Sequence, residues 1–212
     1  MSIGLSTTEY LMPKTGALKL EDGAKPPLRK HILNIADELF YKEGIRATGI
    51  DTIIAKSGVA KSTLYRYFPS KDDLVVAYLE QRNQRFWDLL EAELSKYPSP
   101  GVEKLLRVFT WLDELLAKPE CLGCPFIITT AEYGDLDYPG HQVAVKHKQA
   151  VLERLTQLAE EANVNNPGQL AAVLLLLIDG AFVQRRLFGK VPEVSLAKVA
   201  EGLISKHARN SL

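Results

Sequence analysis

The sequence contains little cysteine and no long apolar run, and each shortage excludes a class of protein. Two cysteines in 212 residues, Cys121 and Cys124, provide no disulfide framework, so a reducing cytoplasm is the expected compartment. The longest apolar run covers residues 171–178 and stops at Asp179, far short of the roughly 20 residues that a membrane span needs. No basic segment followed by an apolar one opens the chain, so secretion is not expected.

Net charge is absent as well, which argues against a protein that coats nucleic acid with its whole surface. The 26 basic and 26 acidic residues are nevertheless unevenly placed. Nine basic and four acidic residues lie between Lys25 and Lys71, so this segment has a charge of +5 and the rest of the chain −5. A basic segment joined to an acidic one indicates a polyanionic partner at one end of the molecule only.

Apolar periodicity predicts helices along almost all of the chain after Pro27. About nine helices are expected, at residues 28–43, 48–57, 61–68, 70–96, 102–118, within 125–133, and at 140–162, 169–188 and 195–208. No stretch alternates with a period of two, so the predicted fold class is all-α. Residues 1–27 have no sustained period and are expected to form a flexible tail, in which Glu9, Glu21 and Asp22 argue against a DNA-binding arm.

Residues 48–71, TGIDTIIAKSGVAKSTLYRYFPSK, have the pattern of two short helices that meet at a tight turn. Gly58 suits this turn because glycine adopts a left-handed backbone conformation without strain. The apolar residues of the segment can share a small core with the preceding helix; they are Ile53, Ile54, Val59, Leu64 and Phe68. A glycine between two short helices is a weak signal alone, but the complete string predicts a DNA-binding helix-turn-helix.

The second short helix begins with small polar side chains and one cation, as a recognition helix requires. Short side chains let its backbone enter the major groove, where Lys61 and Thr63 can reach base edges or a thymine methyl group. Contacts to DNA phosphates are expected from Thr48, at the start of the preceding helix, and from Tyr65, Tyr67 and Lys71.

These segments resemble the TetR family of repressors. The resemblance lies in LFYKEG (residues 39–44), in Thr48 and in SGVAKSTLYRYFPSKDDL (residues 57–74), and it covers roughly residues 28–80. It implies a nine-helix subunit with three domains or segments: a tail at 1–27, a helix-turn-helix DNA-binding domain at 28–71, and a ligand-binding and dimerisation domain at 72–212. It also implies that Lys61, Ser62 and Thr63 face bases, while Thr48, Tyr65, Tyr67 and Lys71 hold phosphates.

Residues 169–208 are expected to form the surface of a homodimer. The helix at 169–188 is apolar nearly all round, so it needs cover from its own subunit and from a partner. A central core helix in a monomer is the alternative. Dimerisation would also allow a palindromic operator to be read, with half-sites about 34–36 Å apart or a multiple of that spacing.

A small-molecule pocket between the C-terminal helices is the second expected site, for an effector of unknown identity. The candidate lining residues are mainly aromatic: Phe86, Trp87, Phe109, Trp111, Phe126, Tyr133, His141 and His147. A zinc site is not expected, because His141 and His147 lack the spacing of a second ligand pair to complement Cys121 and Cys124.

The favoured function is therefore a cytoplasmic transcriptional repressor that a small-molecule inducer releases from double-stranded DNA. No nucleophile–base pattern or phosphate loop indicates an enzyme, and no catalytic residue, cofactor or metal is expected. Two alternatives stay open: a redox-responsive regulator gated by the thiol of Cys124, and a helical adaptor that no longer binds DNA.

Overall fold

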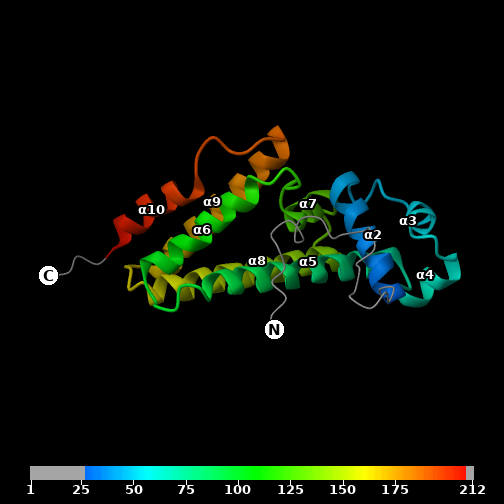
Figure 1. Ribbon diagram of the computed structural model, residues 1–212, viewed down its shortest axis with the longest axis horizontal. Coiled ribbons are helices and arrows are strands. Elements are labelled where there is room, and N and C mark those ends of the chain that lie inside the picture. The colour runs from blue at the N-terminus through cyan, green and yellow to red at the C-terminus, as the bar shows by residue number, and fades with distance from the viewer. Residues whose placement is uncertain (1–26, 209–212) are drawn as a thin grey trace.

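The computed structural model describes residues 27–208, and within this range the protein folds into nine α-helices with no β-strand (Figure 1). The helices, labelled as in Figure 1, are α2 (Leu28–Glu43), α3 (Ile50–Ser57), α4 (Lys61–Tyr67), α5 (Lys71–Leu94), α6 (Val102–Leu116), α7 (Pro125–Glu132), α8 (Pro139–Glu161), α9 (Pro167–Phe188) and α10 (Leu196–His207). The predicted all-α class is confirmed. The predicted flexible tail at 1–27 lies outside the described residues, apart from Pro27.

The starts of α8 and α9 differ from the expected bounds by one and two residues. We expected these helices to begin at residues 140 and 169. The structure instead places Pro139 and Pro167 at the first position of these helices. Proline fits there because its fixed φ is already helical and the missing N–H has no partner within the first turn.

Local capping explains how α3, α4 and α5 follow each other so closely. Gly58 ends α3 with a φ of 68°, the left-handed conformation predicted for this turn. The Oγ atom of Ser70 accepts a hydrogen bond from the backbone N–H of Asp73 at 3.1 Å and caps α5, as predicted. These two features fix the chain reversal before α4 and the one after it, so they determine where α4 lies.

The helices form two groups along the long axis of the molecule (Figure 1). Helices α2, α3 and α4, called the head below, lie at one end, and α5–α10, called the body, occupy the rest. Within the body α8 packs against α5, α7 and α9, and α10 packs against α6 and α9. The α5 helix belongs to the body but also packs against α2, so it connects the two groups.

One apolar core continues through both groups. In the head, Ile53, Leu64 and Phe68 are buried against the apolar face of α2, as predicted. Ile54 and Val59 are partly buried and pack against the same core. Since buried apolar area supplies most of the stability of a small helical unit, this packing is what orients the short α4 helix. None of the helices described is long and apolar enough to cross a membrane.

Candidate DNA-binding site and ligand cavity

The outer face of α4 carries the polar residues that were predicted to contact DNA bases. Lys61 and Ser62 are exposed, Thr63 is partly buried, and Leu64 on the opposite side is completely buried. Lys61 Nζ lies 3.5 Å from Asp51 Oδ1, and both side chains are well exposed. An exposed ion pair of this kind contributes about 0–1 kcal/mol, so it does not prevent Lys61 from turning to another anion.

Three of the four residues expected to hold phosphates surround this face. Tyr65 is exposed, Tyr67 is partly buried beneath the guanidinium of Arg66, and Lys71 is partly buried at the start of α5. Partial burial lowers the pKa of Lys71, while Glu132 and Asp72 nearby oppose the shift. The exposed face of α4 is therefore flanked by the tyrosine hydroxyls of α4 itself and by the lysine ammonium group at the start of α5.

Thr48, the fourth residue expected to hold a phosphate, does not lie on this surface. Its side chain is 1% exposed, and its hydroxyl donates a hydrogen bond of 2.7 Å to the carbonyl oxygen of Gly44. Helix α3 begins at Ile50 with Gly49 as its N-cap. Thr48 was expected at the start of this helix, but it lies two residues before it, and its hydroxyl instead fixes the turn between α2 and α3.

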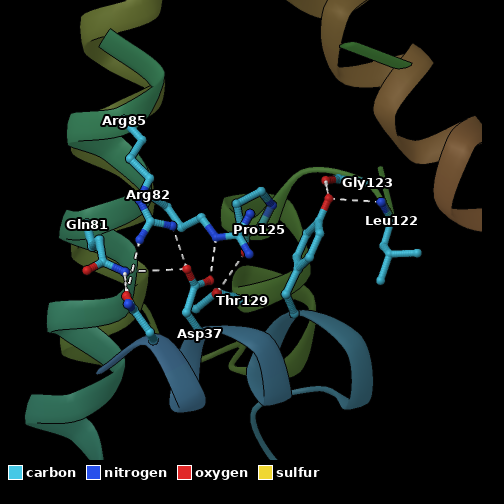
Figure 2. A network of polar contacts seen from close by, with 10 residues as sticks. Asp37, Gln81, Arg82, Arg85, Leu122, Gly123, Pro125 and Thr129 are labelled. Carbon is cyan, nitrogen blue, oxygen red and sulfur yellow. Dashed lines mark hydrogen bonds and ion pairs between the residues drawn. The ribbon is translucent and has the colours of Figure 1, made fainter. Parts of the chain in front are cut away.

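A buried ion pair connects the head to the body (Figure 2). Asp37 of α2 accepts hydrogen bonds from Arg82 Nε at 2.6 Å and from Arg85 Nη1 at 2.7 Å, and the side chains of Asp37 and Arg82 are both completely buried. The Arg82 guanidinium also lies over the ring of Tyr41, 4.1 Å from its centroid. Removing one partner of such a pair costs about 3–5 kcal/mol, so this contact holds α2 firmly on α5.

Tyr41 forms a second connection, to the loop before α7. Its hydroxyl donates to the carbonyl oxygen of Gly123 at 2.8 Å and accepts from the backbone N–H of Leu122 at 2.9 Å, as Figure 2 shows. Burial raises the pKa of this hydroxyl, so it stays protonated and can keep both hydrogen bonds. The two bonded residues lie between Cys121 and Cys124.

Glu132, at the end of α7, makes the third connection. Its carboxylate accepts hydrogen bonds from the backbone N–H groups of Ile45 and Arg46 at 3.1 and 2.7 Å. Tyr133 follows it, stacked on Tyr138 with ring centroids 4.0 Å apart and with the Arg46 guanidinium over its ring. Tyr133 was predicted to contact a ligand, but the structure places it at this junction of head and body, so that assignment is corrected.

A small enclosed cavity lies inside the body, between α5, α6, α7, α8 and α9. Four of the predicted ligand residues line it: Phe86, Trp87, Phe126 and His147. Phe109, Trp111 and His141 are corrected, because they are not among the lining residues. Phe109 is buried in the core, Trp111 packs edge-on against Phe86, and His141 bonds the carbonyl oxygen of Tyr133.

Polar groups of the cavity were missed by sequence reasoning, apart from His147. Lys148 and Arg154 of α8 and Cys124 also line it. The cavity face of α8 includes residues 147, 151, 154, 155 and 158, a helical spacing that is visible in the sequence. The two cations on that face would nevertheless have been predicted to point into solvent.

Both cysteines are free and buried. Cys124 is the N-cap residue of α7, as was expected from its position before Pro125. Burial raises the pKa of the Cys121 thiol, which disfavours the reactive thiolate. Among residues 27–208, no three His, Cys, Asp or Glu side chains gather closely enough to hold a metal ion.

Comparisons with known proteins agree with this arrangement. The sequence model of the bacterial regulatory proteins, tetR family, matches residues 32–78, which include most of α2, all of α3 and α4, and the start of α5. The HTH-type transcriptional repressor NemR of Escherichia coli (strain K12) is 26% identical over 171 residues, which cover 75% of this chain and 84% of NemR. The HTH-type transcriptional regulator YjdC of the same organism is 24% identical over 178 residues, covering 83% of this chain and 93% of YjdC.

The similarity to solved structures extends through the body. A TetR-family transcriptional regulator from Streptomyces coelicolor aligns with a TM-score of 0.75 and 31% identity, covering 86% of this chain and 96% of that one. Regulators of this family are DNA-binding proteins that act as dimers, and they are not enzymes. With the helix-turn-helix and the helical body in the same order along the chain, this protein belongs to the TetR family of transcriptional regulators.

Proposed function

We propose that the protein is a repressor whose homodimer holds two α4 helices in the major groove of a palindromic operator and releases DNA when a small molecule enters the body. The exposed polar face of α4 is the observation that carries this proposal, because Lys61, Ser62 and Tyr65 have no structural task there. NemR, a relative with 26% identity, is itself named a transcriptional repressor.

The contacts divide into those that read bases and those that position the protein. Lys61, Ser62 and Thr63 stand in the first turn of α4, where a recognition helix contacts base edges. Tyr65, Tyr67 and Lys71 then bind phosphates, which orient the helix without reading sequence. Thr48 is left out because it is buried. Residues 28–71 act as the DNA-binding domain in this proposal, and 72–212 as the regulatory domain.

The exposed side of α9 supports a dimer surface. Exposed apolar residues lie on one side of α9, because successive positions are three and four residues apart. They are Val173, Leu176, Val183 and Leu187, with Gly180 in the middle of the series. Leu176 is 73% exposed and Leu187 is 70% exposed. Such an apolar stripe is costly to leave in water, and a second copy related by a twofold axis would cover it with the same stripe.

Helix α7 provides the coupling between ligand and DNA. Phe126 in its first turn lines the cavity, and Glu132 at its end holds the backbone of Ile45 and Arg46 in the head. Eight residues form a rigid rod about 12 Å long, so a ligand that displaces Phe126 also moves Glu132. The loop before α7 shifts too, and it carries the partners of Tyr41.

The energetic demand on this coupling can be stated. Reversing a 1:99 equilibrium between DNA-binding and released conformers to 99:1 requires about 5.5 kcal/mol of differential ligand affinity. Loss of the hydrogen bonds to Glu132 and Tyr41 provides a distinct second state with fewer contacts between head and body. A largely buried ligand can supply that difference, whereas a surface ligand makes too few contacts.

Selection of fragments from the source genome by the purified dimer tests the proposal. The wild-type protein should enrich a palindrome, and the double variant Lys61→Ala/Tyr65→Ala should enrich none. The variant Lys190→Ala, which removes an exposed lysine after α9, is the matched control and should behave as wild type. If a well-folded wild-type dimer enriches no sequence, the adaptor alternative replaces this proposal.

The thiol-gated alternative makes the opposite prediction for one residue. In the proposed mechanism Cys124 lines the cavity but undergoes no oxidation, so Cys124→Ser, which keeps its size and a hydrogen-bonding group, should keep the response to the effector and show no response to peroxide. In a thiol-gated regulator this substitution would abolish the response. Release of operator DNA, followed by fluorescence anisotropy with either stimulus, separates the two mechanisms.

A further inference from the structure

The protonation state of His147, which lines the cavity, is fixed by its neighbours. The indole N–H of Trp87 can only donate a hydrogen bond, so the Asn83 atom 3.0 Å from it is the amide oxygen. The same oxygen lies 2.8 Å from Nδ1 of His147, which must therefore carry a proton. Burial, together with the charge of Lys148, lowers the pKa of His147 to about 3, so the ring is neutral and its Nε2 is an acceptor.

This acceptor is not used by the protein itself. Within residues 27–208 no donor forms a hydrogen bond with Nε2 of His147. The imidazole ring is 5% exposed and lies among rings: Phe126 stacks on it with centroids 3.7 Å apart, and Phe86 meets it edge-on at 5.0 Å. Nε2 itself keeps some accessible surface within this mainly apolar enclosure, so a ligand that brings a donor can reach it.

The cations that line the cavity are already paired with carboxylates, which disfavours an anionic ligand. Lys148 pairs with Asp179 of α9, and Arg154 forms hydrogen bonds of 2.8 and 3.1 Å with the two carboxylate oxygens of Glu91. Asp179 and Glu91 do not line the cavity themselves. A carboxylate ligand would have to compete with these pairs and lose its own hydration, so a neutral ligand is favoured.

The cavity is nearly closed, with a volume of about 30 Å³, so a ligand must displace a side chain. Phe126 and Lys148 also line a surface groove of about 350 Å³ between α7, α8 and α9, and they form the partition between groove and cavity. A ligand that displaces Phe126 would join the two spaces and could approach His147 from the groove.

We propose that the effector is a neutral aromatic molecule with a hydroxyl or N–H donor, typified by an alkylphenol, which displaces Phe126 and donates to Nε2 of His147 in the plane of the imidazole ring. This inference rests on the proposed ligand response and names the chemical class of the ligand. The aromatic part provides the area that a buried ligand needs, and the donor provides selectivity, since a buried acceptor is satisfied only by the donor.

Three probes that share a butylphenyl body test the inference by calorimetric titration at neutral pH without DNA. The probes are 4-butylphenol, its methyl ether 4-butylanisole, and the anion 4-butylbenzoate. The phenol should bind about tenfold more tightly than the ether, because a net hydrogen bond contributes roughly 1–1.5 kcal/mol. The benzoate should bind more weakly than both. Equal binding of phenol and ether, tightest binding of benzoate, or no binding of the phenol would overturn the inference.

Variants on α8 assign the preference to a residue. His147→Phe should reduce the phenol-to-ether affinity ratio to about one, and His147→Gln, which keeps an acceptor, should restore part of it. The matched control is His141→Phe, on the same helix but outside the cavity, and it should keep the wild-type ratio. If His147→Phe does not fold, as judged by circular dichroism, the Gln variant and the probe series decide.

Operator release, measured separately, distinguishes this inference from the function on which it rests. Binding of the phenol without any release of DNA would contradict the proposed mechanism and leave the ligand class intact. Release of DNA by a molecule of another class, with no binding of the phenol, would contradict the ligand class and leave the mechanism intact.

Discussion

The head and the body place their functional groups in opposite ways. The head and the first residue of α5 present the residues proposed to bind DNA on the outside, within the short stretch from Lys61 to Lys71. The body hides the polar groups of its cavity inside, and it draws them from α5, α7 and α8. A rigid polymer such as DNA can only be met by a surface, whereas a small ligand gains affinity from enclosure.

Polar residues also cost the two regions different amounts of folding free energy. An exposed lysine or serine on α4 costs the fold little, because surface substitutions usually change stability by less than about 0.5 kcal/mol. In the body each buried polar atom needs a partner, and Asn83 satisfies both Trp87 and His147 with one oxygen. The head can therefore change its DNA sequence preference freely, while a change of ligand requires several coordinated substitutions.

The contrast applies to the groups that contact DNA and ligand, because the body also has an exposed apolar surface on α9 that we propose as the dimer interface. Leu176→Asp should dissociate the dimer, because two leucines lose about 1.5–3 kcal/mol of burial each and two charges approach. Sedimentation velocity should show a monomer at concentrations where the wild type is dimeric. Leu136→Asp, at a residue 66% exposed outside α9, is the control and should leave the dimer unchanged. A dimer that survives Leu176→Asp would place the interface elsewhere.

The junction between the two regions offers the next largest effect. Asp37→Ala removes the carboxylate that faces Arg82 and Arg85, and it should lower the free energy of unfolding by about 3–5 kcal/mol. Urea denaturation measures this loss. Asp88→Ala removes an exposed carboxylate of α5 and should change stability by less than about 0.5 kcal/mol. If both variants lost the same amount, the buried pair would not be what joins head to body.

Sequence reasoning succeeded where structure is local. The helix positions, the left-handed Gly58 and the Ser70 cap follow from spacing and backbone preference, and all are observed. Thr48 shows the limit: it was expected at the start of a helix with its hydroxyl toward a phosphate, and a shift of two residues turned it inward. Helix α9 was expected to begin after Pro167, although the first position of a helix accepts proline.

The cavity and the junction could not be predicted in full, because both depend on tertiary contacts. Aromatic residues identified Phe86, Trp87 and Phe126, but the same criterion chose Phe109 and Trp111, which fill the core beside the cavity. Nothing in the spacing of Asp37 and Arg82 indicates that they meet, since 45 residues separate them. A buried charge is visible only once its partner is in place.

The buried His147 should make the stability of the body depend on pH. Because the pKa of His147 is lowered to about 3 in the folded protein, the unfolded chain binds more protons between pH 6.5 and 3. Stability should therefore fall as the pH drops below 6.5, by about 1.4 kcal/mol per unit once the unfolded histidine is protonated. Urea titrations at pH 7 and pH 5 measure this loss, and His147→Phe should reduce it while His141→Phe should not. An identical slope in all three proteins would mean that His147 is not held neutral.

The smallest expected effects are on DNA binding, and they test whether the surface residues from Thr63 to Lys71 act independently of each other. Lys71→Ala should reduce the dependence of operator affinity on salt by about one unit of slope, because one phosphate contact is lost. Affinity measured across salt concentrations gives the slope, and Lys190→Ala provides a matched lysine far from the head. Thr63→Ala should leave the slope unchanged and alter the preference at one base position, which selection from random DNA detects. An unchanged slope for Lys71→Ala would remove this residue from the phosphate contacts, and a slope change in Thr63→Ala would show that base and phosphate contacts are not separable on α4.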